Sequence, residues 1–99
     1  MEIKELQKFQ AEMDKKYWDH EGTIDESIRH ITLHLGKLLG KLAAYCEEVD
    51  HGKKTSQEII RNEVVPDLLM HSLRLANLTG VNVEEKYDKR AEQIKKIFR

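Results

Sequence analysis

The sequence predicts an all-α protein, and three observations support this fold class. Apolar residues recur at spacings of three and four along most of the chain, which is the period of an amphipathic helix. No segment keeps the alternation of a half-buried strand for five residues. The composition, with 35% charged residues, one proline and five glycines, is typical of a helical domain with a charged surface. At 99 residues the chain is expected to form one domain, residues 1–99.

The first predicted helix covers residues 2–19. Gly22 lies in the polar stretch that follows and marks the break. The apolar stripe of this helix has three-four spacing, with Phe9 beside it, and contains Ile3, Leu6, Gln10, Met13 and Tyr17.

The second predicted helix begins at Thr23 or Asp25 and ends near residues 50–54. Glu26 lies three residues after Thr23, which is the spacing of a capping box. An unbroken apolar seam runs through three heptads of this helix and contains Ile28, Ile31, Leu35, Leu38, Leu42, Tyr45 and Val49. A seam of this length is expected to pack against other helices, in the same chain or in a partner.

Three small residues in this helix also carry predictions. Gly36 and Gly40 each cost about 1 kcal/mol relative to alanine, so a closely packed neighbour is expected to compensate. Cys46 has no catalytic base placed by the sequence and is interpreted as a small core residue.

The third predicted helix begins at Ser56 and ends at Gly80. Pro66 interrupts it and predicts either a kink or a helix that ends there and a new one that starts. The apolar face is broad, so this helix is expected to be the most buried. It contains Ile59, Ile60, Val64, Val65, Leu68, Leu69, Leu73, Ala76 and Leu78.

The fourth predicted helix is capped by Asn82, with two glutamates in its first turn that suit the helix dipole. Its apolar stripe is narrow and contains Tyr87, Ala91, Ile94 and Phe98.

Composition excludes several classes of function. The net charge of −1 is unlike that of a strongly basic nucleic-acid-binding protein, so no nucleic-acid partner is expected. No apolar run approaches the roughly 20 residues needed to cross a bilayer, and the N-terminus lacks a hydrophobic signal core. A cytoplasmic protein without a membrane partner is therefore expected. The single cysteine allows no intramolecular disulfide.

Two helical segments carry the strongest functional signal. Residues 34–43 read H-L-G-K-L-L-G-K-L-A, and residues 63–80 read E-V-V-P-D-L-L-M-H-S-L-R-L-A-N-L-T-G. The chain resembles the MazG-like family of all-helical nucleoside triphosphate pyrophosphohydrolases, whose motifs read H-L-x-x-E-x-G-E-L-A and E-E-L-x-D-x-L-x-x-x-L-x-L-A-N-x-x-G. Residues 75–85 are also close to the family's L-A-x-x-x-G-I-D-L-E-E. The resemblance implies a four-helix MazG-like fold, with antiparallel helices that pack into a helical-bundle oligomer.

In the resembled family, four acids on two adjacent helices hold Mg²⁺ against the substrate triphosphate. The resemblance places Leu38, Lys41, Val64 and Asp67 at those four positions. Glu63 is a second acid, one place earlier than the family pattern requires. Mg²⁺ prefers oxygen ligands, and an ammonium group in the pocket repels it. We therefore interpret Asp67 and Glu63 as a vestigial metal site, and expect no catalytic residue and no cofactor.

Lys41 has two interpretations. It could supply the positive charge that the metal supplies elsewhere, by pairing with Asp67 or Glu63. It could instead extend to solvent and contact neither acid. If a nucleotide binds, the resemblance implies that Lys89 contacts its phosphates. Trp18 could stack on the base of that nucleotide, or it could simply pack at the end of its amphipathic helix, which is the more common role.

The leading hypothesis is a catalytically inactive MazG-like protein retained for binding or assembly, whose partner is a second copy in a homodimer or homotetramer. A nucleotide is the small-molecule ligand that the resemblance implies. The alternative is an active Mg²⁺-dependent pyrophosphohydrolase with relocated carboxylate ligands, for which Glu47, Glu48, Asp50 and Glu58 are available. A third hypothesis keeps only the bundle, as a module that binds a protein partner through an amphipathic face.

The histidines form a separate candidate site. His30 and His34 are four residues apart in the second predicted helix, a spacing that can hold zinc. Position 31 is an isoleucine, so the zinc-protease pattern H-E-x-x-H is absent. Because five histidines in 99 residues readily produce such a pair by chance, the sequence favours a half-buried structural role and leaves zinc binding open. A third ligand would have to come from His71, Glu26 or His20.

Overall fold

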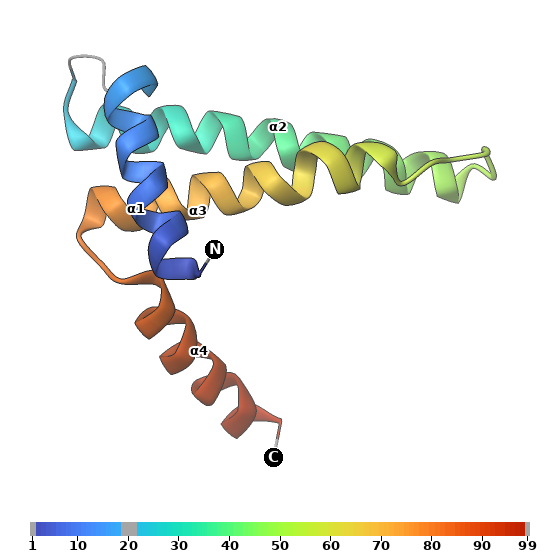
Figure 1. The fold of residues 1–99 in the computed structure, drawn as a ribbon. Coiled ribbons are helices and arrows are strands. Elements are labelled where there is room, and N and C mark those ends of the chain that lie inside the picture. The colour runs from blue at the N-terminus through green and yellow to red at the C-terminus, as the bar shows by residue number, and fades with distance from the viewer. Residues whose placement is uncertain (1, 19–21, 99) are drawn as a thin grey trace. The chain divides into compact units, whose positions relative to one another are not determined.

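The computed structural model describes residues 2–18 and 22–98, and within these ranges the regular structure is entirely helical. The predicted all-α class and the four predicted helices are confirmed. Figure 1 shows the order of the helices, which are α1 (Ile3–Met13), α2 (Ile24–Asp50), α3 (Val65–Thr79) and α4 (Val83–Ile97). There are also two short π-helical segments: η1 (Asp14–Trp18) directly follows α1, and η2 (Ile60–Val64) directly precedes α3. No helix among the described residues is long and apolar enough to cross a membrane.

The chain divides into two compact units, and each is described by itself. The first unit comprises Met1–Glu21 together with Leu73–Arg99, and the second comprises Gly22–Ser72. Helix α3 contributes its first turns to the second unit and its last turns to the first.

In the first unit, the predicted helix of residues 2–19 is helical from Ile3 to Trp18, and residue 19 lies outside the described residues. The predicted stripe is only partly packed. Ile3 and Tyr17 are exposed, whereas the polar Gln10 is buried. The buried face of α1 is therefore centred on a polar residue, whose side-chain amide donates to Asp14.

The junction between α3 and α4 forms as the sequence predicts. Gly80 has a φ of 71°, which is the left-handed conformation that ends many helices. The Val81 amide reaches back to the Ala76 carbonyl at 3.0 Å, as in a Schellman motif. Asn82 then caps α4, because its side-chain oxygen accepts the Glu85 amide at 3.1 Å. Most of the α4 stripe is exposed, and among its described residues none is buried.

In the second unit, α2 begins at the predicted cap. The Thr23 hydroxyl accepts the Glu26 amide at 3.1 Å, so Thr23 rather than Asp25 is the N-cap. The seam faces the packed side of the helix, with Ile31 fully buried and Leu38 nearly so. Its last member, Val49, is exposed.

Two predictions for α2 are wrong within the single chain. No atom comes within 4 Å of a Cβ built on Gly36 or Gly40, so no neighbour packs closely there. At 100° per residue, both glycines lie on the side of α2 opposite the Leu38 seam, which explains the open space. Cys46 is exposed and is not a core residue, because it lies at the edge of the same seam.

The helix that follows accommodates Pro66 through a change of hydrogen-bond register. In η2 the Val65 amide reaches the Ile60 carbonyl, five residues back, and α3 begins at Val65. Proline has no amide hydrogen to donate, and a π-helical turn before it is one way in which a helix absorbs that loss. The predicted interruption at Pro66 is thus a change from π-helical to α-helical bonding.

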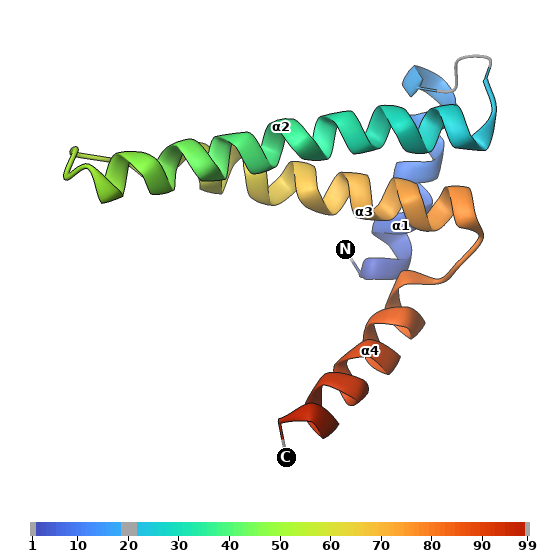
Figure 2. The same ribbon diagram turned by 180° about the vertical axis from the view of Figure 1, so that it is seen from behind.

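Within the second unit, α2 and the segment that runs from η2 into α3 lie side by side in opposite directions (Figures 1 and 2). The contacts agree with this antiparallel arrangement, because the later residue of α2, Lys41, contacts Glu63, whereas the earlier residue, His34, contacts His71.

α3 contains more buried residues than any other described helix, namely Leu73, Arg74 and Ala76. The prediction that it is the most buried helix is confirmed, although Leu69 and Met70 are exposed.

Candidate functional site

Two of the four positions at which the resembled family has metal-binding acids are filled by core side chains. Leu38 of α2 is 4% exposed, and Val64 of η2 is 1% exposed. Both are aliphatic, so neither offers an oxygen ligand. Their burial contributes about 1.5 to 3 kcal/mol each to the hydrophobic core of the second unit. Both side chains are part of the packed core of the second unit.

The third position, Lys41, is occupied by an ion pair. Its Nζ donates to Oε1 of Glu63 at 3.0 Å, which joins α2 to η2. Of the two interpretations of Lys41, pairing with an acid is the one observed. The side chains of Lys41 and Glu63 are 41% and 50% exposed, so solvent screens the pair and it contributes at most about 1 kcal/mol.

The fourth position, Asp67, retains its carboxylate. It lies in the first turn of α3 and is half-buried. In the part of the chain that the structure describes, no ion pair or hydrogen bond reaches this carboxylate. The same ranges contain no group of three or more histidine, cysteine, aspartate or glutamate side chains arranged to hold a metal ion.

A shallow groove adjoins Lys41. Its volume is about 160 Å³, and it is lined by Lys41, Ala44, Tyr45, Glu48, Ser56, Ile59 and Ile60. Ligand pockets usually enclose about 300 to 1,000 Å³. The groove beside Lys41 is therefore too small to enclose a nucleoside triphosphate.

The two residues predicted to contact a substrate belong to the first unit. Trp18 lies in η1, and the Arg74 guanidinium sits over its ring, 4.8 Å from the centroid. One face of the indole is thus covered by a cation rather than open to a base. Lys89 is exposed on α4, where its neighbour Arg90 donates to Gln93 at 3.0 Å.

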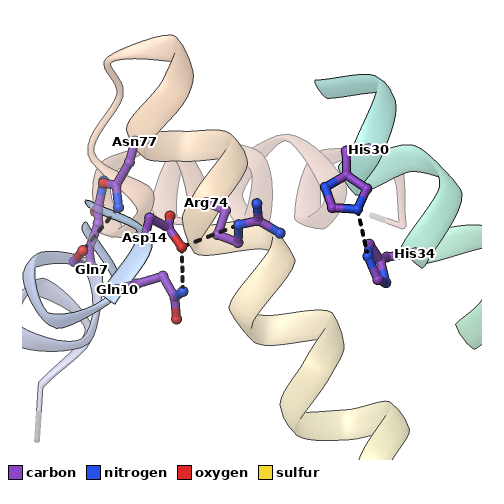
Figure 3. Close-up of polar contacts among 7 residues, drawn as sticks. All are labelled: Gln7, Gln10, Asp14, His30, His34, Arg74 and Asn77. Carbon is purple, nitrogen blue, oxygen red and sulfur yellow. Dashed lines mark hydrogen bonds and ion pairs between the residues drawn. The ribbon is translucent and has the colours of Figure 1, made fainter. Parts of the chain in front are cut away.

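A polar network that the sequence does not predict joins α1 to the end of α3 and the start of α4 (Figure 3). Gln7 donates to the Asn77 side chain at 3.0 Å and to the Val81 carbonyl at 2.7 Å. Asn77 returns a bond to the Gln7 carbonyl at 3.0 Å. The Gln7 side-chain oxygen accepts the Val83 amide at 3.1 Å, which satisfies an amide in the first turn of α4.

A buried charge lies on the same face of α1. Arg74 is 6% exposed, and its Nε lies 3.3 Å from Oδ1 of Asp14. Gln10 donates to the same oxygen at 2.8 Å (Figure 3). Because Arg74 and Asp14 are 60 residues apart, local patterns give no signal for this pair. The one available signal is Gln10 itself, a polar residue in an otherwise apolar stripe.

Three histidines meet in the second unit. The Nε2 atoms of His30 and His34 are 3.1 Å apart, and their rings meet edge to face with centroids 4.6 Å apart (Figure 3). His71 of α3 stacks on the His34 ring, with a centroid separation of 5.4 Å. His34 and His71 are half-buried, as a structural role predicts, whereas His30 is exposed. His20, a third candidate ligand, lies outside the described residues.

Comparison with protein-family models, with curated proteins and with solved structures finds no match.

Proposed function

We propose that this chain is a self-associating helical module of the MazG-like type, in which Mg²⁺-dependent pyrophosphohydrolase activity is lost and binding or assembly remains. The observation that carries the proposal is the contact between Lys41 and Glu63. At the place where the resembled family holds a divalent cation, this chain pairs an acid with its own ammonium group.

Electrostatics supports the loss of Mg²⁺ binding. Two unit charges 4 Å apart interact by about 1 kcal/mol in water and about 4 kcal/mol at the effective dielectric of a protein surface. An ammonium beside a divalent ion therefore costs about 2 to 8 kcal/mol. The aliphatic side chains of Leu38 and Val64 supply no oxygen ligand to offset that cost.

The outer face of α2 supports self-association. Leu33 and Leu39 are 60% and 62% exposed, although they lie near the middle of a 27-residue helix. Gly36 lies between them in the sequence and Gly40 directly follows Leu39, and no atom comes within 4 Å of a Cβ built on either glycine. Small residues beside exposed leucines allow a second helix to approach closely and bury apolar area, which would offset the helix-propensity cost of the glycines. A second copy presents the same face, as a two-fold dimer interface requires.

The α3 side of the second unit adds further apolar surface. Val65, Leu69 and Met70 are all exposed. A monomer of this size buries a modest fraction of its surface, so covering these side chains in a homodimer or homotetramer would add stability that the isolated chain lacks.

Sedimentation equilibrium of the whole chain tests this proposal. We expect a dimer or tetramer at micromolar concentration, and a monomer under those conditions would contradict the assembly role. Pyrophosphate release from nucleoside triphosphates in the presence of Mg²⁺ or Mn²⁺ would instead support the alternative of an active enzyme with relocated carboxylates.

A further inference from the structure

We infer that His30 and His34 form a binding site for a divalent transition-metal ion that prefers imidazole ligands, with Zn²⁺ as the representative ion. The residue spacing alone is weak support, because such pairs arise by chance. The added observation is the direction of the rings, since the two Nε2 atoms converge to 3.1 Å (Figure 3).

The contact between the two rings requires a lone pair on at least one of them. Two N–H groups repel each other at this separation, so one nitrogen donates and the other accepts. An imidazole nitrogen with a free lone pair is also the form that binds a metal. When the metal binds, the ring that donates in this contact gives up its Nε2 proton, to solvent or to its own Nδ1, so that both Nε2 atoms present a lone pair to the ion.

The spacing of the nitrogens fits a tetrahedral ion. With Zn–N bonds of about 2.0 to 2.1 Å, two ligands of a tetrahedron lie about 3.3 Å apart. The observed 3.1 Å between the Nε2 atoms is within a few tenths of an ångström of that value. A small opening of the two side chains would admit the ion.

The surroundings of the pair hold one of the two ligands in place. Ile31, between the two histidines in sequence, is fully buried and fixes the orientation of this part of α2. His71 stacks on the His34 ring with an interplanar angle of 22°, and so positions it. His30 lies on the exposed side of the pair.

Among the described residues the site has two ligands, His30 and His34, since these ranges contain no group of three or more that could hold a metal ion. Water would complete the coordination, as it does at open zinc sites. Imidazole suits Zn²⁺, Cu²⁺ and Ni²⁺ rather than Mg²⁺. The site is thus chemically separate from the acids Glu63 and Asp67, and it does not depend on the proposed function.

Isothermal titration of the untagged chain with ZnCl₂ tests this inference. We expect saturable binding in the wild type that is lost in His30→Ala and in His34→Gln, while circular dichroism shows that both variants remain helical. His51→Ala is the matched control, because it removes a histidine from the end of α2 and is expected to bind as the wild type does.

A stoichiometry of one ion per chain or one ion per two chains supports the site, provided that both variants lose binding. Absence of binding to the wild type would overturn it, as would undiminished binding in either variant or an equal loss in His51→Ala. A parallel titration with MgCl₂ is expected to give no saturable heat, and this arm reports on the acid positions rather than on the histidines.

Discussion

Lys41 Nζ lies 3.0 Å from Glu63 Oε1, and this contact joins α2 to η2. The pair is exposed and adds little stability, so its main consequence is electrostatic. On the proposed function, it puts an ammonium group at a position where the resembled family has a metal-binding acid.

Reversing the charge at this position should create Mg²⁺ sensitivity. Lys41→Glu places a second carboxylate against Glu63, so we expect the free energy of unfolding to fall by up to about 1 kcal/mol without metal. Added Mg²⁺ should then raise the melting temperature, because the ion binds only the folded variant. Thermal melts with 0 and about 10 mM MgCl₂ measure the effect through this linkage.

Lys37→Glu is the matched control, because it makes the same change of charge at an exposed position one turn earlier in α2. Its melting temperature should not respond to Mg²⁺. An equal response in the control would mean that general screening, rather than the position of Lys41, causes the shift.

The buried pair of Arg74 and Asp14 should be essential for the first unit. Arg74→Met keeps most of the side-chain volume but leaves the Asp14 carboxylate without its cation. We expect the free energy of unfolding to fall by about 3 kcal/mol, the lower end of the range for a broken buried pair, because Asp14 retains 22% exposure.

Urea denaturation followed by Trp18 fluorescence measures this loss, since Arg74 covers the Trp18 ring. Arg90→Met on the exposed face of α4 is the control and should change stability by less than about 0.5 kcal/mol. Equal effects of the two substitutions would argue against the buried pair.

Gln7 should behave as a structural residue despite its half-exposed position. Gln7→Leu preserves volume and leaves the Val83 amide and the Asn77 Oδ1 without their Gln7 side-chain partners, while Asn77 can still donate to the main-chain carbonyl of residue 7. We expect a loss of about 1 to 3 kcal/mol. Amide hydrogen exchange should show faster exchange at Val83, whereas Gln93→Leu, which disturbs only an exposed contact with Arg90, should leave that amide unchanged.

A larger side chain on the outer face of α2 should stabilise the folded monomer and weaken self-association. Gly40→Leu meets open space in the single chain and improves helix propensity by about 1 kcal/mol, so the folded monomer should become more stable. A second copy packed closely on that face would be pushed away, so we expect dissociation to shift to higher protein concentrations. Sedimentation equilibrium measures this shift.

Leu39→Asp tests the same face by charge, and it should also weaken association. Lys86→Asp, at an exposed position on α4, is the control and should leave the association constant unchanged. Unaltered association in both α2 variants would place the interface elsewhere.

Local features of this fold follow from the sequence, whereas its long-range contacts do not. Thr23, Asn82 and Gly80 act within four residues of themselves, so their capping roles are predictable from type and spacing. Pro66 predicts an interruption, but not that η2 absorbs it by a π-helical turn.

In the candidate sites, too, the sequence predicts some features and misses the long-range contacts. The sequence names Lys41 and Glu63 as a possible pair, because the resemblance brings their helices together. It does not reveal that Arg74 is buried against Asp14, since a charged residue in an amphipathic helix is ordinarily placed on the solvent side. Nor does spacing alone show that the rings of His30 and His34 face each other.

The most direct test of the central claim is an assay for pyrophosphate release from the common nucleoside triphosphates, with Mg²⁺ or Mn²⁺ present. With the ammonium of Lys41 bound to Glu63, and with Leu38 and Val64 in the core, we predict no release above the rate without protein. Release that requires the divalent ion and disappears in Asp67→Asn would contradict the proposal that this helical module has lost the chemistry of the family it resembles.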